Sequence, residues 1–126
     1  IIDMGTGSGA ILITLLAELP RATGLGTDVS PEALQVARSN ALRNAVAGRA
    51  RFELAHALDG IAGPFDVLVS NPPYIPSADV LTLEPAVRDY DPALALDGGP
   101  DGLLIYRQIA ARAGAVVPSG LIALEV

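Results

Sequence analysis

Short apolar segments alternate with amphipathic ones along the whole chain, and this alternation narrows the possible folds more than any other feature. The pattern predicts strands at residues 1–4, 23–28, 51–54, 65–69 and 121–126, and the first and fourth of them are expected to be buried. Apolar residues at helical spacing predict helices at residues 10–19, from residue 31 onward, and at residues 102–115. Strands that alternate with helices pair in parallel. We therefore predict an α/β fold with an open, doubly wound parallel sheet and helices on both faces.

The predicted helices carry their apolar residues on one face. In the first helix these residues are Ile11, Leu12, Leu15, Leu16 and Leu19. Ser30 is a favourable N-cap and Pro31 suits the first helical position, so a second helix is expected to begin there. Its expected buried residues are Leu34, Ala37, Ala41, Leu42 and Ala45. A long irregular stretch, rich in proline and glycine, is expected at residues 72–100.

Length and composition indicate one compact domain. The chain has 126 residues, and 51% of them are hydrophobic, as in a globular protein. It has no cysteine, which excludes a disulfide framework or a thiolate metal site and suits a cytoplasmic protein. The longest apolar run, residues 10–17, is far too short to cross a membrane. Because the chain begins and ends inside predicted strands, we expect it to be part of a longer protein.

The charge balance bears on the choice of partner. The net charge is −6, and residues 79–101 hold six acidic residues against one arginine. Proteins that grip nucleic acid usually present a basic face, because phosphate neutralisation supplies much of the affinity. The sequence has no basic run. A polypeptide is therefore the better candidate substrate, and a nucleic-acid substrate is not expected.

A glycine-rich loop follows the first predicted strand and leads directly into a helix. It comprises Gly5, Thr6, Gly7, Ser8 and Gly9. Glycines permit positive φ angles and close approach of a ligand, and a helix N-terminus supplies unpaired N–H donors. Asp28, at the end of the next strand, can accept hydrogen bonds from both hydroxyls of a ribose. Loop and acid together predict a nucleoside cofactor, although Gly5, Gly7 and Ala10 also satisfy a loose dinucleotide-binding pattern.

The loop after the fourth predicted strand separates these two classes of cofactor. It consists of Asn71, Pro72, Pro73 and Tyr74. Consecutive prolines fix the backbone and leave their carbonyl groups free as acceptors, beside the side-chain oxygen of Asn71. Two acceptors at a fixed angle can hold both hydrogens of a planar NH₂ group, and Tyr74 offers a ring face for stacking. A dehydrogenase has no use for this arrangement, whereas a methyltransferase that modifies an amide or an exocyclic amine does.

The chemistry of amides explains why such a loop is needed. An amide nitrogen is a poor nucleophile because its lone pair is shared with the carbonyl group. Hydrogen bonds accepted from its two N–H groups return electron density to the nitrogen and aim it for in-line displacement. Most of the rate then comes from positioning and preorganised dipoles. The loop from Asn71 to Tyr74 therefore predicts transfer of a methyl group to a nitrogen that it holds.

These motifs carry a resemblance to a known family. The glycine-rich loop, Asp28 and the loop from Asn71 to Tyr74 resemble Rossmann-like class I methyltransferases of the amino-methylating kind. The residues that follow restrict the resemblance to one family within this class. They are Ile75-Pro76, Glu84-Pro85 and the run from Asp91 to Leu103. They resemble the HemK/PrmC family of release factor glutamine methyltransferases over essentially the whole chain. The final run is more specific than the Asn-Pro-Pro-Tyr motif, which adenine-modifying DNA methyltransferases share.

The resemblance implies a cofactor, a partner and a set of site residues. The cofactor is S-adenosyl-L-methionine, which leaves as S-adenosyl-L-homocysteine, and it lies against Gly5, Thr6, Gly7, Ser8, Gly9, Asp28 and Asn71. The partner is a peptide chain release factor, whose Gly-Gly-Gln loop places its glutamine against Asn71, Pro72, Pro73 and Tyr74. The family's N-terminal helical domain and closing antiparallel hairpin are expected to lie outside residues 1–126. We expect a cytoplasmic monomer that acts in translation termination, without membrane contact.

Other polar residues allow more than one interpretation. His56 follows the third strand, where the family often places an aromatic residue beside the adenine, so it either stacks on the cofactor or is a solvated loop residue. Asp59 is a weaker candidate for accepting a hydrogen bond from the adenine amine. Thr6 and Ser8 either add hydroxyl contacts or satisfy turn geometry. Five acidic residues lack regular ligand spacing and are interpreted as a solvated face, so no metal is expected: Glu84, Asp89, Asp91, Asp97 and Asp101.

Three functions remain open from the sequence. The first is methylation of a release factor glutamine. The second is methylation of N6 of adenine or another exocyclic amine of a nucleic-acid base, which would need a basic, base-stacking surface. The third is a non-catalytic nucleoside-binding domain, which would have no need for Asn71 and Tyr74.

Overall fold

A single parallel sheet organises the molecule, as the computed structural model of residues 1–80, 82–83 and 93–126 shows. Its five strands lie in the order β3-β2-β1-β4-β5, and every neighbouring pair is parallel. The strands are β1 (Ile2–Met4), β2 (Gly24–Asp28), β3 (Ala50–Leu54), β4 (Val67–Ser70) and β5 (Leu121–Leu124). The predicted α/β fold class with an open parallel sheet is therefore confirmed.

Among the described residues, three longer helices and two single-turn helices connect the strands. They are α1 (Ala10–Glu18), α2 (Pro31–Arg43), α3 (Ser77–Val80), α5 (Ala93–Leu96) and α6 (Leu104–Val116). The prediction of purely irregular structure at residues 72–100 is thus wrong, because α3 and α5 lie within it. Helix α6 begins later than predicted, because Gly102 has a φ of +73°, which no right-handed helix accommodates. No helix among the described residues is long and apolar enough to span a membrane.

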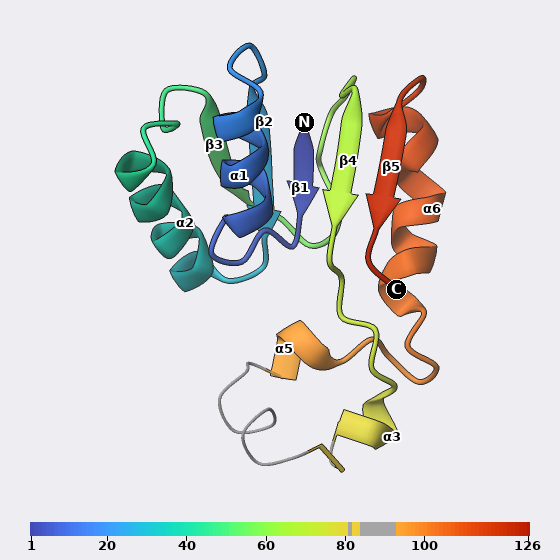
Figure 1. Cartoon of the computed structure of the whole chain (residues 1–126). Coiled ribbons are helices and arrows are strands. Elements are labelled where there is room, and N and C mark those ends of the chain that lie inside the picture. The colour runs from blue at the N-terminus through green and yellow to red at the C-terminus, as the bar shows by residue number, and fades with distance from the viewer. Residues whose placement is uncertain (81, 84–92) are drawn as a thin grey trace.

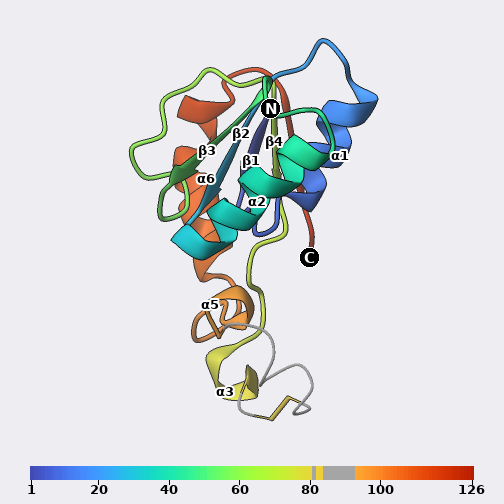
Figure 2. The same ribbon diagram turned by 90° about the vertical axis from the view of Figure 1, so that its left-hand side faces the viewer.

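The helices form layers on the two faces of the sheet, as Figure 2 shows. Helices α1 and α2 pack on one face around a cluster that includes Leu12, Leu34 and Phe52. Helix α6 packs on the other face, where Ile109 and Val116 join buried residues of the strands. The N-cap predicted for α2 is confirmed, because the Ser30 hydroxyl accepts a hydrogen bond of 3.1 Å from the Ala33 N–H group.

The expected buried faces of α1 and α2 are correct only in part. The residues that are buried as expected are Leu12, Leu16, Leu34, Ala37 and Ala41. Leu42 is 71% exposed, because it lies one residue, or about 100°, around the helix from the buried Ala41. Ala45 lies beyond the end of α2 and is exposed, with a φ of +57°. Ile11 and Leu19 are also exposed, since α1 has the sheet on one side only.

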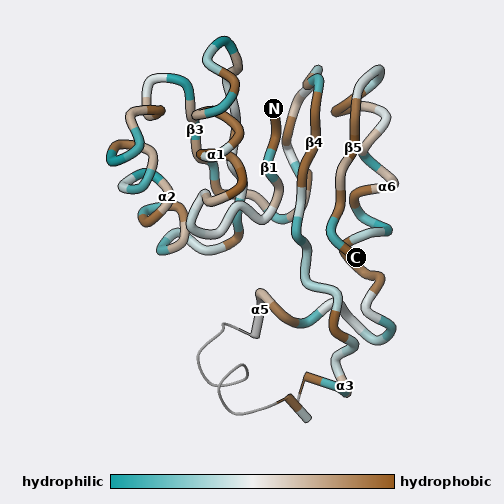
Figure 3. Tube along the Cα trace, in the orientation of Figure 1, coloured by the Kyte–Doolittle hydropathy of each residue, from teal (hydrophilic) through white to brown (hydrophobic). Residues whose placement is uncertain are grey.

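The carboxyl ends of the strands form one edge of the sheet, from which the motif-bearing loops emerge. Strand β1 lies between β2 and β4, with Met4 opposite Thr27 on one side and Ser70 on the other. The chain order reverses at this point, where parallel sheets bind ligands. Figure 1 shows α3 and α5 below this edge, and Figure 3 shows the chain changing from hydrophobic to hydrophilic as it leaves β4.

Candidate active site

The register of β1 and β4 places the two principal motifs side by side. Met4 is the last residue of β1 and is paired with Ser70, the last residue of β4. The glycine-rich loop begins at the next residue, Gly5, and the second loop begins at Asn71. The buried Ser70 hydroxyl also donates a 2.7 Å hydrogen bond to the Met4 carbonyl, which ties the bases of the two loops together. Ser70 is not among the site residues predicted from the sequence, although it directly precedes Asn71.

Three glycines shape the loop between β1 and α1. Gly5, Gly7 and Gly9 have φ angles of +69°, +53° and +82°, which other residues rarely adopt. A Cβ atom on Gly5 or Gly7 would meet nothing within 4 Å, so this part of the backbone faces open space. A Cβ on Gly9 would lie 2.9 Å from the Ile13 side chain and 3.2 Å from Ala37. The first two glycines therefore leave room for a ligand, while the third allows α1 to pack against α2.

Asp28 lies beside this loop, as expected for a ribose-binding acid. Its Oδ2 atom accepts a 2.8 Å hydrogen bond from the Gly7 N–H group, and its Oδ1 atom accepts one of 3.0 Å from Ser30. A carboxylate has about four acceptor sites, so both oxygens retain capacity for hydroxyl donors. The carboxylate thus shapes the loop and can still bind a ligand. Its contact with a ribose stays a prediction.

Asp3 is a buried carboxylate beneath the loop that the sequence analysis did not single out. Its Oδ2 atom accepts hydrogen bonds from the Thr6 hydroxyl at 2.7 Å and the Leu12 N–H group at 3.2 Å. Among the described residues, its Oδ1 atom has no partner. Burial raises the pKa of Asp3 to about 6, and the nearby Asp28 adds to the increase. The sequence feature that indicates such a role is an acidic residue inside a predicted buried strand, next to the glycine-rich loop.

The two hydroxyl residues of the loop differ in orientation. Thr6 is buried, and its hydroxyl bonds to Asp3, so it supports the loop from below. Ser8 is exposed, and its carbonyl group accepts a 3.0 Å hydrogen bond from the Asn40 side chain. The hydrogen bond to Asp3 within this turn therefore explains why a hydroxyl residue stands at position 6. A direct contact of either hydroxyl with a cofactor stays a prediction.

His56 lies on the same edge of the sheet, after β3. The preceding residue, Ala55, donates a 3.0 Å hydrogen bond to the Asp28 carbonyl group, which brings this loop near the glycine-rich one. The His56 side chain is 58% exposed, and its Nδ1 atom lies 3.7 Å from Asp59. That distance is too long for a good hydrogen bond, and exposed pairs contribute little. The position allows adenine stacking, which stays a prediction for His56.

The loop after β4 combines buried and exposed residues. Pro72 is fully buried, whereas Asn71 is exposed and the Tyr74 side chain is 44% exposed. Among the described residues, no hydrogen bond reaches the Asn71 side chain or the carbonyl groups of Pro72 and Pro73. The loop therefore combines a backbone restricted by two prolines with an exposed Asn71 side chain that can accept hydrogen bonds.

The acidic residues do not gather into a metal site within the described ranges. No cluster of potential metal ligands is found there, and Glu84, Asp89 and Asp91 lie outside the described residues. Asp97 accepts a hydrogen bond from Ser77, and Asp101 accepts one from Arg107.

One hollow in the described surface is remote from these motifs. It measures about 510 Å³ and is lined by residues at the amino ends of the strands, among them Ile1, Arg49 and Phe65. We give more weight to the carboxyl edge, because open parallel sheets bind ligands there and because the motif residues converge on it.

Comparison with known proteins identifies the family. Residues 1–87 match the family model of the methyltransferase small domain. The chain belongs to this family. The release factor glutamine methyltransferase of Rhodospirillum rubrum is 52% identical over 99% of this chain and 39% of its own length. That of Agrobacterium fabrum is 48% identical over 100% of this chain and 44% of its own length.

A solved structure is also similar to this chain. TrmN from Thermus thermophilus matches 58% of this chain and 23% of its own, with a TM-score of 0.54 and 30% identity. The resemblance to the HemK/PrmC family predicted from the motifs is confirmed by the names of the curated relatives. The chain spans less than half the length of these relatives.

Proposed function

We propose that the protein containing this chain transfers a methyl group from S-adenosyl-L-methionine to the side-chain amide nitrogen of a glutamine. The glutamine is that of the Gly-Gly-Gln loop of a peptide chain release factor. The observation that carries this proposal is the pairing of Met4 with Ser70, because it brings a cofactor-type loop next to the unused acceptors of Asn71 and the prolines. The names of the curated relatives support the choice of acceptor.

The electrostatics of the glycine-rich loop favour a cationic cofactor. Asp3 lies beneath the loop and Asp28 lies beside it. Because the pKa of Asp3 is about 6, this buried group is mostly ionised at neutral pH. Negative potential at the loop attracts the sulfonium and ammonium groups of S-adenosyl-L-methionine and repels the pyrophosphate of a dinucleotide. The buried Asp3 therefore argues against the dinucleotide alternative that the glycine spacing left open, whereas Asp28 could accept from the ribose of either cofactor.

The residues at the carboxyl edge fit this cofactor. The backbone from Gly5 to Gly9 would lie against its amino-acid part, Asp28 would accept from its ribose, and His56 would lie near its adenine. When bound, S-adenosyl-L-methionine supplies an electrophilic methyl carbon. We infer that residues 1–126 are part of the catalytic domain that binds it.

The Asn71–Tyr74 loop would hold the acceptor. The Asn71 side-chain oxygen and a proline carbonyl would each accept one N–H bond from the glutamine amide, while Tyr74 would stack on its plane. Held in this way, the amide nitrogen would be aimed at the methyl carbon that the cofactor supplies, with the thioether of S-adenosyl-L-homocysteine as leaving group and the amide proton passing to solvent. Preorganised acceptors accelerate this step because they are already aligned before the charge shifts.

The setting of the reaction follows from its substrate. Release factors act in translation termination, so we propose a cytoplasmic enzyme, and we propose that it acts as a monomer. Adenine N6 is the alternative acceptor, because the same carbonyl groups could hold an exocyclic amine. The net charge of −6 argues against a nucleic-acid substrate.

The proposal is tested by supplying the full-length protein with S-adenosyl-L-methionine labelled in the methyl group. Three potential acceptors are compared: a release factor, the same factor with the loop glutamine replaced by alanine, and DNA. We expect label only on the unaltered release factor. Label on DNA alone would refute the proposed acceptor, and label on both versions of the release factor would exclude the loop glutamine.

A further inference from the structure

A distant segment of the chain runs alongside the residues that continue the Asn71–Tyr74 loop. This segment, residues 96–102, is called the clamp. The Ile75 N–H group donates to the Leu96 carbonyl at 3.1 Å, and the Gly98 N–H group donates to the Ile75 carbonyl at 2.8 Å. The Ser77 N–H group donates to the Gly99 carbonyl at 2.9 Å. These bonds form a short parallel bridge outside the main sheet.

The Asp97 side chain reinforces this bridge. Its Oδ1 atom accepts a 2.6 Å hydrogen bond from the Ser77 hydroxyl and a 2.8 Å hydrogen bond from the Gly99 N–H group. A single oxygen thus joins the clamp to the chain that follows Tyr74. The same two hydrogen bonds lower the pKa of Asp97, as expected for a carboxylate that is hydrogen-bonded when charged.

Two glycines of the clamp lie directly against the backbone of the loop. A Cβ atom on Gly98 would lie 2.8 Å from the Pro73 carbonyl oxygen and 2.8 Å from the Tyr74 Cα. A Cβ on Gly102 would collide with the Tyr74 carbonyl oxygen. Real Cβ atoms are not found so close to backbone atoms, so a larger residue at Gly98 would displace Pro73.

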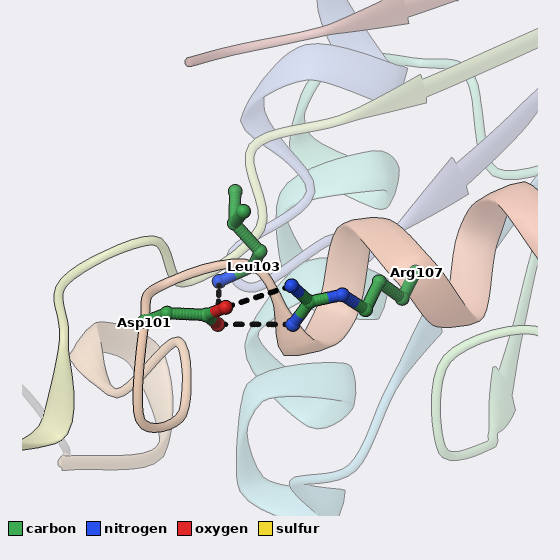
Figure 4. Close-up of polar contacts among 3 residues, drawn as sticks. All are labelled: Asp101, Leu103 and Arg107. Atoms are coloured by element: carbon green, nitrogen blue, oxygen red, sulfur yellow. Dashed lines mark hydrogen bonds and ion pairs between the residues drawn. The ribbon is translucent and has the colours of Figure 1, made fainter.

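The far end of the clamp is anchored to a longer helix. Asp101 makes two hydrogen bonds with Arg107 of α6, at 3.0 and 2.7 Å, and accepts a third from the Leu103 N–H group at 3.1 Å (Figure 4). Helix α6 in turn buries Ile109 and Val116 against the sheet. The clamp is therefore attached to the rigid core at one end and holds the loop at the other.

We propose that the clamp sets the position of the Pro73 carbonyl and the Tyr74 ring, with Gly98 and Asp97 as positioning residues for methyl transfer. This inference rests on the proposed function, because it assigns the clamp a role in holding the acceptor nitrogen. Prolines fix the torsions of the loop but do not fix its distance from the cofactor. A displacement of about 1 Å at an acceptor group can reduce the rate by about a hundredfold, so the clamp would control kcat.

The test compares three glycine-to-alanine substitutions in the full-length protein. Gly98→Ala introduces a backbone collision at the clamp, whereas Gly120→Ala introduces a similar collision with the Asp66 carbonyl at the opposite edge of the sheet. Gly114→Ala adds a Cβ in open space. We expect Gly98→Ala to lower kcat by at least about tenfold and to change the Kd of S-adenosyl-L-methionine by less than about twofold. Gly120→Ala should lower thermal stability and leave the kcat of the folded protein unchanged.

A second pair of variants tests the side-chain link without adding bulk. Asp97→Ala removes the acceptor that joins Ser77 to Gly99 and should lower kcat, whereas Asp97→Asn retains a side-chain oxygen and should restore most of the activity. Ser77→Ala and Ser77→Thr form the matching pair, because threonine keeps the hydroxyl group. Recovery by the conservative variants is the result that a merely structural role would not give.

The outcomes separate this inference from the proposed function. If the unaltered enzyme methylates the release factor but Gly98→Ala and Asp97→Ala retain its kcat, the clamp has no positioning role. The inference also fails if folded Gly98→Ala and Gly120→Ala lose kcat equally. If the unaltered enzyme methylates DNA instead, the proposed function fails. The same variants measured on DNA then test the clamp, because the carbonyl groups of the loop would hold either acceptor.

Discussion

The two loops at the switch point are held in place by different kinds of contact. The Gly5–Gly9 loop is fixed by Asp3 and Asp28, which belong to the strands on either side of it in the sequence. The Asn71–Tyr74 loop is followed by residues that depend on the clamp, with Ser77 and Asp97 lying 20 positions apart. Both loops therefore use a carboxylate about 20 positions away, since Asp28 lies 21 positions from Gly7, but among the described residues only the glycine-rich loop is also held by a carboxylate close in the sequence, Asp3.

The loops also differ in electrostatics. The glycine-rich loop has two carboxylates against it, while the second loop offers neutral amide and carbonyl oxygens. A charged site suits the binding of a cationic cofactor, and neutral acceptors suit an uncharged amide whose nitrogen must remain nucleophilic. Substitutions in the first loop should therefore affect binding, and those in the second should affect turnover.

The strongest test of this division is Asn71→Ala. It removes one of the two acceptors proposed to hold the amide, so kcat should fall by about a hundredfold or more while the Kd of the cofactor stays nearly constant. Steady-state kinetics and calorimetric titration measure the two quantities. Asn71→Asp keeps the shape but adds a negative charge near the sulfonium, so it should slow turnover even if the cofactor binds more tightly. Near-normal turnover of Asn71→Ala would show that the loop has only a structural role.

Asp28→Ala should show the opposite pattern. It removes the proposed ribose acceptor and the hydrogen bond to Gly7, and hydrogen bonds to a charged group contribute about 1.5–3 kcal/mol each. We expect the Kd of S-adenosyl-L-methionine to rise by about tenfold or more, with a smaller change in kcat at saturating cofactor. Titration calorimetry measures this Kd, and an unchanged value would show that Asp28 does not bind the cofactor.

Asp3 gives the glycine-rich loop a pH dependence. The folded-state pKa of about 6 lies above the ordinary value of 3.8, so the folded protein binds this proton more tightly than the unfolded chain does. The contribution of Asp3 to the free energy of unfolding should therefore be fully present below about pH 4 and lost as pH rises through about 6. The loss should be at most about 3 kcal/mol, at about 1.4 kcal/mol per pKa unit.

Chemical denaturation between pH 4 and pH 7 measures this dependence. In Asp3→Asn the side chain cannot ionise, so the decline over this range should be smaller than in the unaltered protein. An identical pH profile for the two proteins would show that Asp3 titrates normally.

The smallest effect is expected at Tyr74. Tyr74→Phe keeps the ring face and should reduce kcat by less than about threefold, whereas Tyr74→Ala removes the ring and should cost more, since aromatic contacts contribute about 0.5–1.5 kcal/mol. Both variants should bind the cofactor normally. A larger loss in Tyr74→Phe than in Tyr74→Ala would show that the hydroxyl group, and not the ring, is the functional part.

The sequence by itself determined the main strands and helices and which motifs follow the strands at the carboxyl edge of the sheet. Alternating apolar and amphipathic segments predicted the parallel sheet, because strand and helix periods are local properties of the chain. The candidate site motifs could also be recognised in the sequence, since glycine conformations, proline rigidity and side-chain chemistry belong to the residues themselves. These motifs are Gly5–Gly9, Asp28 and Asn71–Tyr74. These loops lie together as expected because parallel strands end at the same edge.

Only the tertiary structure decided which residues support that site. The exposure of Leu42 beside the buried Ala41 depended on how wide a face of α2 the neighbouring elements cover, and the sequence does not give that width. The high pKa of Asp3 arises from burial beneath the loop, and the link from Ser70 to Met4 arises from strand register. The clamp is the clearest case, because the contact of Gly98 with Pro73 joins backbone atoms far apart in the chain. Such contacts depend on distances in space, and a motif records only distances along the sequence.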